Sequence, residues 1–229
     1  MKFIILKNHL RVLLVITILD SLILLIRNWV TDSSYFNFLF WNLFLGLVPL
    51  LIAVFLYYYS GRLGTFFIII GSFLWLLFYP NAPYMITDII HVNENSPAHF
   101  HNLVIYDALI IFLMALLALC YGLYSMKLMK ALFAKTAGKA WTAILINLCI
   151  IISSFGIYLG RILRLNSWDI FTRPLYVLET IADHLFPFSK NPTTYAIIFL
   201  FSFIQFSLLI MIKDIDGVNA PVQQYNHNI

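Results

Sequence analysis

Charged residues are scarce in this chain. Its 229 residues include 14 Lys and Arg and 10 Asp and Glu, which together make up 10% of the chain. A soluble domain ordinarily carries about a quarter charged residues. In a domain of this size a large share of the surface stays exposed, and here that surface would be apolar. The scarcity of charge therefore argues against a soluble enzyme, a disordered regulator and a protein that binds nucleic acid.

Cysteine and the familiar catalytic motifs are scarce as well. The chain has two cysteines, Cys120 and Cys149, which lie in separate apolar segments and have neither disulfide nor metal-site spacing. The sequence contains no Walker motif, no Gly-x-Ser-x-Gly, no His-Glu-x-x-His and no dinucleotide fingerprint. These absences leave no soluble catalytic domain.

Long hydrophobic segments are, in contrast, abundant. Hydrophobic residues make up 62% of the chain, and a helix needs about 20 apolar residues to cross a bilayer. Six segments approach or reach this length, and aromatic residues collect at their edges, as expected at a membrane interface. The predicted spans are residues 10–29, 38–59, 63–79, 103–124, 141–160 and 193–212. We therefore predict an all-α fold, a polytopic transmembrane helical bundle of about six spans with the lipid bilayer as its main partner.

The segment after the fifth span is amphipathic rather than uniformly apolar. Between Arg173 and Phe188, apolar residues at helical spacing can line one side, while Glu179 and Asp183 lie elsewhere. This pattern predicts a short interfacial helix. No repeat or linker divides the chain, so residues 1–213 are predicted to form a single transmembrane helical domain, followed by a short polar tail at 214–229.

The distribution of Lys and Arg predicts the orientation of the bundle. The N-terminus carries three of these residues, and the segment from Lys127 to Lys139 carries four and no acidic residue, whereas residues 80–102 carry none. With six spans the two basic segments share one side, which is predicted to be cytoplasmic. Residues 80–102 and 161–191 then face outward, although the second of these segments contains three arginines and a lysine.

Polar residues in so apolar a chain are candidate functional residues, because they are costly at membrane depth. One group follows the third span, where Pro80 and Pro83 remove backbone donors and stop the helix. Asn81 can satisfy the backbone groups that the break sets free. A break of this kind is tolerated only where it is buried in protein or lines a cavity.

Asp88 and His91 complete this first group. Three residues apart, they would share one face of a short following helix. Two interpretations stay open: a helix cap with an interfacial histidine, or a functional pair that is either half of a metal site or an acid–base pair. A divalent metal is therefore the candidate cofactor, with Asp88 and His91 as its candidate ligands.

Two further polar groups are predicted to meet the same membrane face. Asp107 opens the fourth span, either as an interfacial carboxylate or as one that faces the bundle interior, to pair with Arg161 or Arg164 or to join Asp88 and His91. The two arginines end the fifth span on one face, and they either anchor lipid head groups or hold a phosphate or carboxylate. The short polar residues that follow them include Asn166 and Asp169.

These segments resemble the DUF1361 family. The resemblance rests on the string Trp-Leu-Leu-Phe-Tyr-Pro-Asn-Ala-Pro-Tyr-Met-Ile-Thr-Asp at 75–88, on Gly-Arg-Ile-Leu-Arg-Leu-Asn-Ser-Trp-Asp at 160–169 and on the Tyr-Asp pair at 106–107. It covers most of the chain from the second span onward. The resemblance implies a multi-pass protein of the bacterial cytoplasmic membrane, and it implies no reaction, because the family has no assigned activity.

Three functional hypotheses follow from the polar groups. The first is a membrane-embedded enzyme or binding protein with its site at the outer interface, whose ligand is a phosphate-bearing lipid or envelope precursor. The second is a small ion-coupled transporter that uses Asp20 and Asp107. The third is a structural or accessory subunit of a membrane complex, with protein partners that the sequence does not identify. In the first hypothesis Asp88, His91 and Asp107 are the candidate catalytic residues. The candidate ligand-binding residues are Asn81, Tyr84, Arg161, Arg164, Asn166 and Asp169.

Overall fold

The computed structural model describes residues 2–92, 101–187 and 190–218, and among these residues it contains helices and turns but no strand. The α-helices are α1 (Lys2–Thr31), α2 (Phe38–Tyr59), α3 (Thr65–Phe78), α4 (Asn81–Tyr84), α5 (His101–Thr136), α6 (Lys139–Arg161), α7 (Asp169–Thr172), α8 (Pro174–Leu185) and α9 (Pro192–Val218). Two 3₁₀ helices, η1 (Tyr35–Asn37) and η2 (Met85–Val92), complete the described elements. Most of the polar tail predicted from residue 214 lies outside the described residues.

Six helical segments in the described part of the chain are long and apolar enough to cross a membrane, which confirms the predicted all-α polytopic bundle. Their bounds differ most from prediction in the third and fourth spans. The third segment runs past Pro80 through α4 and η2 to Val92, and the fourth runs to Thr136. The basic segment after Tyr124 stays helical because it is built mostly of Leu, Met, Lys and Ala, which are strong helix formers.

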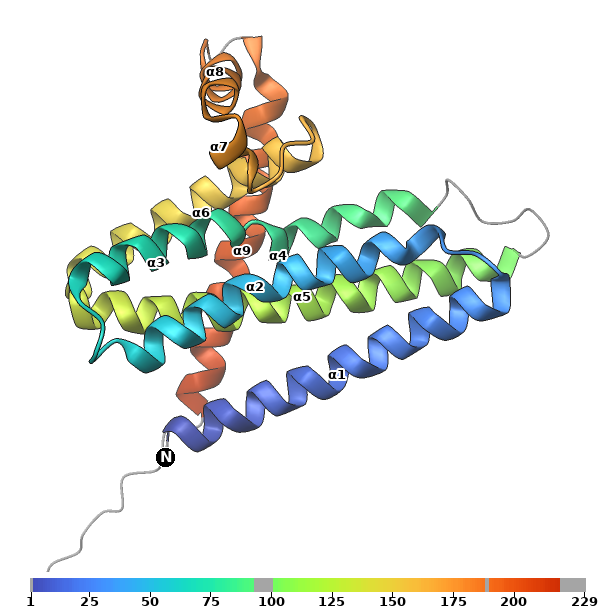
Figure 1. Cartoon of the computed structure of the whole chain (residues 1–229), viewed down its shortest axis with the longest axis horizontal. Coiled ribbons are helices and arrows are strands. Elements are labelled where there is room, and N and C mark those ends of the chain that lie inside the picture. Colours follow the sequence, from blue (N-terminus) through green and yellow to red (C-terminus); the bar gives the residue numbers. More distant parts are fainter. Residues whose placement is uncertain (1, 93–100, 188–189, 219–229) are drawn as a thin grey trace, which may run out of the picture.

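The centre of the bundle is the contact between α2 and α5 (Figure 1), where Leu50 and Ala53 of α2 and Met114 and Ala118 of α5 are all fully or nearly fully buried. On one side α3 packs against α2, and on the other side α1 lies against α5. Helix α9 crosses these helices steeply in Figure 1 and packs against α6. The core is therefore formed by α2 and α5, and the remaining long helices surround it.

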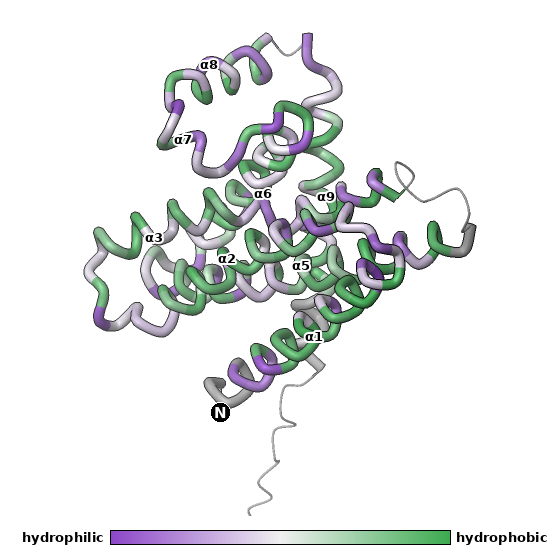
Figure 2. Tube along the Cα trace, turned by 45° about the vertical axis from the view of Figure 1, so that its right-hand side comes forward, coloured by the Kyte–Doolittle hydropathy of each residue, from purple (hydrophilic) through white to green (hydrophobic). Residues whose placement is uncertain are grey.

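The outward faces of the long helices are as apolar as the core. Trp29 of α1 is 84% exposed, and Phe66 of α3 and Phe199 of α9 are 67% and 68% exposed. Figure 2 shows hydrophobic residues along the length of these helices and hydrophilic residues mostly at turns, at helix ends and around α7. In water such surfaces would drive aggregation, so this exposure fits the lipid environment that the composition predicts.

Two glycines bring α6 close to the broken third span. A Cβ atom on Gly156 would lie 2.8 Å from Cγ of Pro80, and one on Gly160 would lie 3.4 Å from the ring of Tyr84. The Gly-x-x-x-Gly spacing puts both glycines on one helix face and lets backbones approach closely in a membrane. The next residue, Arg161, therefore lies beside the segment that follows the break in the third span.

A short helix follows the fifth span, as predicted. Helix α8 covers residues Pro174–Leu185, and Pro174 occupies its first turn, where a proline is well tolerated. It is held over α6 by a hydrogen bond between the Tyr158 hydroxyl and Nδ1 of His184, 3.0 Å long. Val177 is the buried residue of α8. In Figure 1, α7 and α8 stand together at the end of α6, away from the turn between α2 and α3.

Candidate functional site

The site is built on the break after α3. Pro83 has no backbone N–H and cannot donate to Tyr79 O, which accepts from the N–H of Ala82 at 3.2 Å instead. This leaves the carbonyl of Phe78 free to accept a hydrogen bond from Nδ2 of Asn81 at 2.8 Å. Asn81 therefore satisfies a backbone carbonyl that the break sets free, as the sequence predicted. The chain continues through α4 into the 3₁₀ helix η2.

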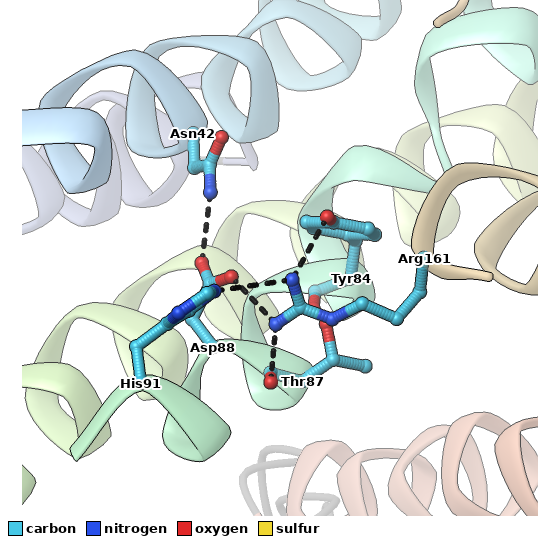
Figure 3. Close-up of polar contacts among 6 residues, drawn as sticks. All are labelled: Asn42, Tyr84, Thr87, Asp88, His91 and Arg161. Atoms are coloured by element: carbon cyan, nitrogen blue, oxygen red, sulfur yellow. Dashed lines mark hydrogen bonds and ion pairs between the residues drawn. The ribbon is translucent and has the colours of Figure 1, made fainter. Parts of the chain in front are cut away.

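Arg161 fills the space beside η2 (Figure 3). Its Nη2 donates to Oδ1 of Asp88 at 3.0 Å and to the backbone carbonyl of Thr87. Its Nη1 donates to the hydroxyl of Tyr84 at 3.2 Å, and the guanidinium carbon lies 5.0 Å from the centre of the Tyr84 ring. Its Nε is buried and has no hydrogen-bond partner in the described part of the chain. One cation thus ties the end of α6 to α4 and η2.

Asp88 is held by partners from two other helices (Figure 3). Its side chain is fully buried. Oδ1 accepts from Arg161, and Oδ2 accepts from Nδ2 of Asn42 on α2 at 2.9 Å. A buried carboxylate requires such partners, because an unpaired charge in this environment is costly. Asp88 therefore joins α2, η2 and α6, and both of its oxygens are already engaged.

His91 lies on the same side of η2 as Asp88, since residues three apart eclipse one another in a 3₁₀ helix. Its Nε2 is 3.4 Å from Nη1 of Arg161, and its ring packs edge-on against Phe38 at 4.9 Å between centres. An arginine nitrogen always donates, so Nε2 accepts when the imidazole carries its proton on Nδ1. Asp88 and His91, which the sequence predicted to share one face, therefore both contact the guanidinium of Arg161.

The donor set for a metal is incomplete among the described residues. No three His, Cys, Asp or Glu side chains gather there in an arrangement that could hold a metal ion. The two predicted ligands are engaged instead with the guanidinium of Arg161.

A cavity of about 650 Å³ opens beside this cluster. Its walls come from α2, α3, α4, η2, α6 and the segment from Leu165 to α8. Most of the lining is apolar, and the polar side chains gather toward the end of α6. They are Asn42, Asn81, Tyr84, His91, Arg161, Arg164, Asn166, Ser167 and Trp168. The described lining contains two arginines but neither aspartate nor glutamate, and Asp88 offsets the charge of Arg161 from outside the lining, so the polar end keeps the positive charge of Arg164.

Arg164 is the least constrained cation of this cavity. Its backbone has a φ of 56°, which is uncommon for a residue other than glycine and costs conformational energy. The side chain is exposed, and it forms neither a hydrogen bond nor an ion pair with the described residues. The two arginines that the sequence placed together thus differ: Arg161 is neutralised by Asp88, whereas the charge of Arg164 is uncompensated.

Asp169 shapes the loop that carries Arg164 and Asn166. Its Oδ2 accepts the backbone N–H of Asn166 at 2.7 Å, and its Oδ1 accepts from Nη2 of Arg173 at 2.9 Å. The hydrogen bond from the Asn166 backbone, together with the Arg173 guanidinium, lowers the pKa of the Asp169 carboxyl below its usual value. Asn166 lines the cavity and Asp169 does not. The ligand-binding role predicted for Asp169 stays a prediction, and the observed contacts are structural.

The lowered pKa of Asp169 predicts a pH-dependent contribution to stability. A group whose pKa is lower in the folded state stabilises the fold above its unfolded pKa, about 4 for aspartate, and this contribution is lost as the pH falls through the folded pKa. We expect Asp169→Asn to lower the thermal unfolding midpoint at pH 7, and this difference from wild type to shrink below about pH 4. Unfolding scans in detergent from neutral to acidic pH measure it. A difference that stays constant over this range would contradict the assignment.

Asp107 is engaged at a different place. Its two oxygens accept from Nε and Nη2 of Arg27 on α1, at 2.8 and 2.9 Å, and both side chains are almost completely buried. The guanidinium carbon lies 4.6 Å from the centre of the Phe36 ring. Asp107 does not line the cavity, and it is paired with neither Arg161 nor Arg164. Its predicted catalytic role stays a prediction.

The sequence did not identify the partners of two residues in these clusters. Asn42 is a lone amide in an otherwise apolar span, and sequence reasoning gave it no contact with Asp88. Arg27, near the end of the first span, was not assigned to Asp107. A polar side chain within a membrane span was the available signal in both cases, but the identity of its partner depends on which helices are neighbours.

The comparison with family models returns a match over residues 41–208, to the family described as "Protein of unknown function (DUF1361)". No curated protein and no solved structure matches the chain. Because the family match spans well over half of the 229 residues, and includes both segments that carry the resemblance, the chain belongs to the DUF1361 family.

Proposed function

We propose that this member of the DUF1361 family binds an anionic amphiphile, a lipid or envelope precursor that carries a phosphate, in the cavity beside Arg161 and Arg164. The observation that carries the proposal is the distribution of charge in the lining. Two arginines and a histidine lie at one end, no described carboxylate lines the cavity, and apolar side chains from α3 and α6 line the remainder. A ligand with one negative head and an apolar body complements both parts.

The two arginines contribute to binding in different ways. Arg161 is oriented by its contacts with Thr87, Asp88 and Tyr84, so little side-chain freedom would be lost when it binds a ligand. Arg164 brings a charge that Asp88 does not neutralise. A guanidinium presents several N–H donors in one plane, which suits the oxygens of a phosphate. We infer that Arg164 makes the main contact with the phosphate and that Arg161 supports it.

Asp88 and His91 have separate proposed roles. Both oxygens of Asp88 are engaged and the residue does not line the cavity, so we assign it to the positioning of Arg161. His91 lines the cavity, and it is the one imidazole among the described lining residues. A general acid–base role for His91 stays a prediction.

We also infer that the protein lies in the bacterial cytoplasmic membrane with its N-terminus inside. The basic segments at the N-terminus and at 127–139 support this orientation by the positive-inside trend, and the site then faces outward. Labelling of a cysteine introduced at Arg62, in the turn between α2 and α3, tests the orientation. A cysteine there is expected to react only with reagents that reach the cytoplasmic side. Reaction with a reagent confined to the outside would show the opposite orientation.

Substitution of Arg164 tests the proposed function most directly. We expect Arg164→Gln to weaken binding of phosphatidic acid by about tenfold or more, because a hydrogen bond to a charged group is worth about 1.5–3 kcal/mol. Titration of the purified protein with phosphatidic acid, followed by native mass spectrometry, measures the loss.

The matched control for this experiment is Arg62→Gln. It removes one exposed arginine from the turn between α2 and α3, outside the cavity lining, and is expected to leave binding unchanged. Diacylglycerol, which lacks the phosphate, should bind wild type and Arg164→Gln equally. If Arg62→Gln and Arg164→Gln weaken phosphatidic acid binding equally, the loss comes from surface charge in general and not from a contact in the cavity. That result would overturn the proposal.

A further inference from the structure

A second cavity continues the first along α3 and α6. It has a volume of about 540 Å³ and lies between α3, α6 and the end of α5. Phe73, Leu76 and Ile152 line both cavities. The two cavities are therefore adjacent and share part of their wall, and together their linings form a trough from the polar end beside Arg161 toward Thr65, at the start of α3.

The trough offers a ligand almost no polar groups. Its described lining is apolar except for Cys149 and three hydroxyl residues, Thr65, Ser72 and Thr136. The hydroxyl of Ser72 donates to the carbonyl of Ile68 at 2.7 Å, and that of Thr136 donates to the carbonyl of Leu132 at 3.0 Å. These two hydroxyls are satisfied within their own helices. The trough therefore suits a hydrocarbon and nothing more polar.

The trough also opens toward the lipid. Ile69 of α3 and Leu148 of α6, which line it, are 62% and 50% exposed. Gly156 of α6 lies close to Pro80, the residue just before α4, and the α6 residues that line the second cavity lie on the far side of Gly156 from Arg161. The hydrocarbon chain of a lipid could thus enter the trough laterally from the membrane.

The length of the trough distinguishes between classes of lipid. Along α3 and the two residues that follow it, the combined lining extends from Thr65 to Pro80, which is about 22 Å at about 1.5 Å per residue. One leaflet of a bilayer core is about 15 Å thick, half of about 30 Å. An ordinary acyl chain from the outer leaflet ends near the midplane, so it would leave the far part of the trough unfilled.

We propose that the trough binds one long isoprenoid chain, and that the ligand of this protein is a polyprenyl phosphate rather than a diacyl phospholipid. The inference rests on the proposed function, because it takes the phosphate at Arg161 and Arg164 as the fixed end of the ligand. From this end the chain lies between α3 and α6 and extends past the bilayer midplane toward Thr65.

Chain-length dependence of binding tests this assignment. The probes are farnesyl phosphate, which has the same head group and a short chain, and a polyprenyl phosphate long enough to cross the bilayer. The hydrocarbon chain of each phosphate moves from apolar detergent to an apolar trough, so the affinity that the longer chain adds comes from packing alone. We expect wild type to bind the long-chain phosphate about fivefold more tightly than farnesyl phosphate, measured by native mass spectrometry of the full chain.

Two tryptophan variants of α6 complete the experiment. Leu148→Trp fills the trough, whereas Ile151→Trp adds the same ring at a residue that is equally exposed, 51% against 50%, and does not line it. We expect Leu148→Trp to abolish the preference for the long chain and Ile151→Trp to keep it. Ile69→Trp, with Ile70→Trp as its control outside the lining, repeats the test from α3 in case Leu148→Trp does not fold.

The outcomes separate this inference from the proposed function. Equal binding of the two phosphates in wild type, with both weakened by Arg164→Gln, overturns the trough assignment and leaves the phosphate site intact. A long-chain preference that survives the trough-filling variants overturns it as well. Binding of neither phosphate to wild type overturns both proposals. A preference lost only in the trough-filling variants supports the polyprenyl assignment.

Discussion

Asp88→Leu is expected to destabilise the protein by about 3 kcal/mol or more, because removing one partner of a buried ion pair leaves the other charge uncompensated. The variant removes the carboxylate that accepts from Arg161 at 3.0 Å and from Asn42 at 2.9 Å. Arg161 is 17% exposed, so water can offset only part of the loss. Thermal and denaturant unfolding in detergent, followed by tryptophan fluorescence, measures the change.

The double variant Asp88→Leu/Arg161→Met separates this structural effect from ligand binding. With both charges gone, no unpaired ion remains, and apolar replacement of a buried pair is often neutral or stabilising. We expect the double variant to recover more than half of the lost stability, while its binding of phosphatidic acid stays weak. If the two single losses simply add in the double variant, the pair is not coupled and Asp88 does not position Arg161.

Arg27→Met is expected to have an effect of similar or larger size, about 3–5 kcal/mol. The Arg27–Asp107 pair has two hydrogen bonds, at 2.8 and 2.9 Å, and its side chains are 1% and 0% exposed. It joins α1 to α5, and Arg27 also lies over the ring of Phe36. Loss of the guanidinium leaves Asp107 buried without its charged partner. The same unfolding measurements in detergent quantify the effect.

The variant Arg27→Met/Asp107→Leu tests the catalytic role that the sequence predicted for Asp107. We expect the double variant to regain most of the lost stability and to bind phosphatidic acid as wild type does, since neither residue lines the cavity. This result would assign Asp107 to the attachment of α1. A double variant that folds normally but no longer binds the lipid would instead support the predicted role at the site.

The two pairs use the scarce charges of this chain in the same physical way. Arg161 and Asp88 connect α6 to η2, and Arg27 and Asp107 connect α1 to α5. Between apolar helices in lipid, association has little hydrophobic driving force, so a paired charge or a close glycine contact makes a specific attachment. The Gly156 contact with Pro80 is the second kind of attachment. Arg164, which lacks such a partner among the described residues, is for this reason the best candidate for an external ligand.

The sequence by itself determined the class of the protein and the segments that carry its polar groups. Long apolar runs are a one-dimensional signal, and they predicted six spans, the helix after the fifth and the break at Pro80. The spacing of Asp88 and His91 predicted correctly that both share one side, because residues three apart are neighbours within one helix.

Only the tertiary structure decided which of these groups meet. An Asp107 that faces the interior was expected to pair with Arg161 or Arg164 or to join Asp88 and His91, yet it pairs with Arg27, and Arg164 lines the cavity with its charge uncompensated. Partner choice depends on which helices lie side by side and on their rotation, and a single sequence does not encode these as a local pattern. The trough between α3 and α6 likewise depends on how these two helices lie beside each other, so its size and its apolar lining could be known only once both were in place.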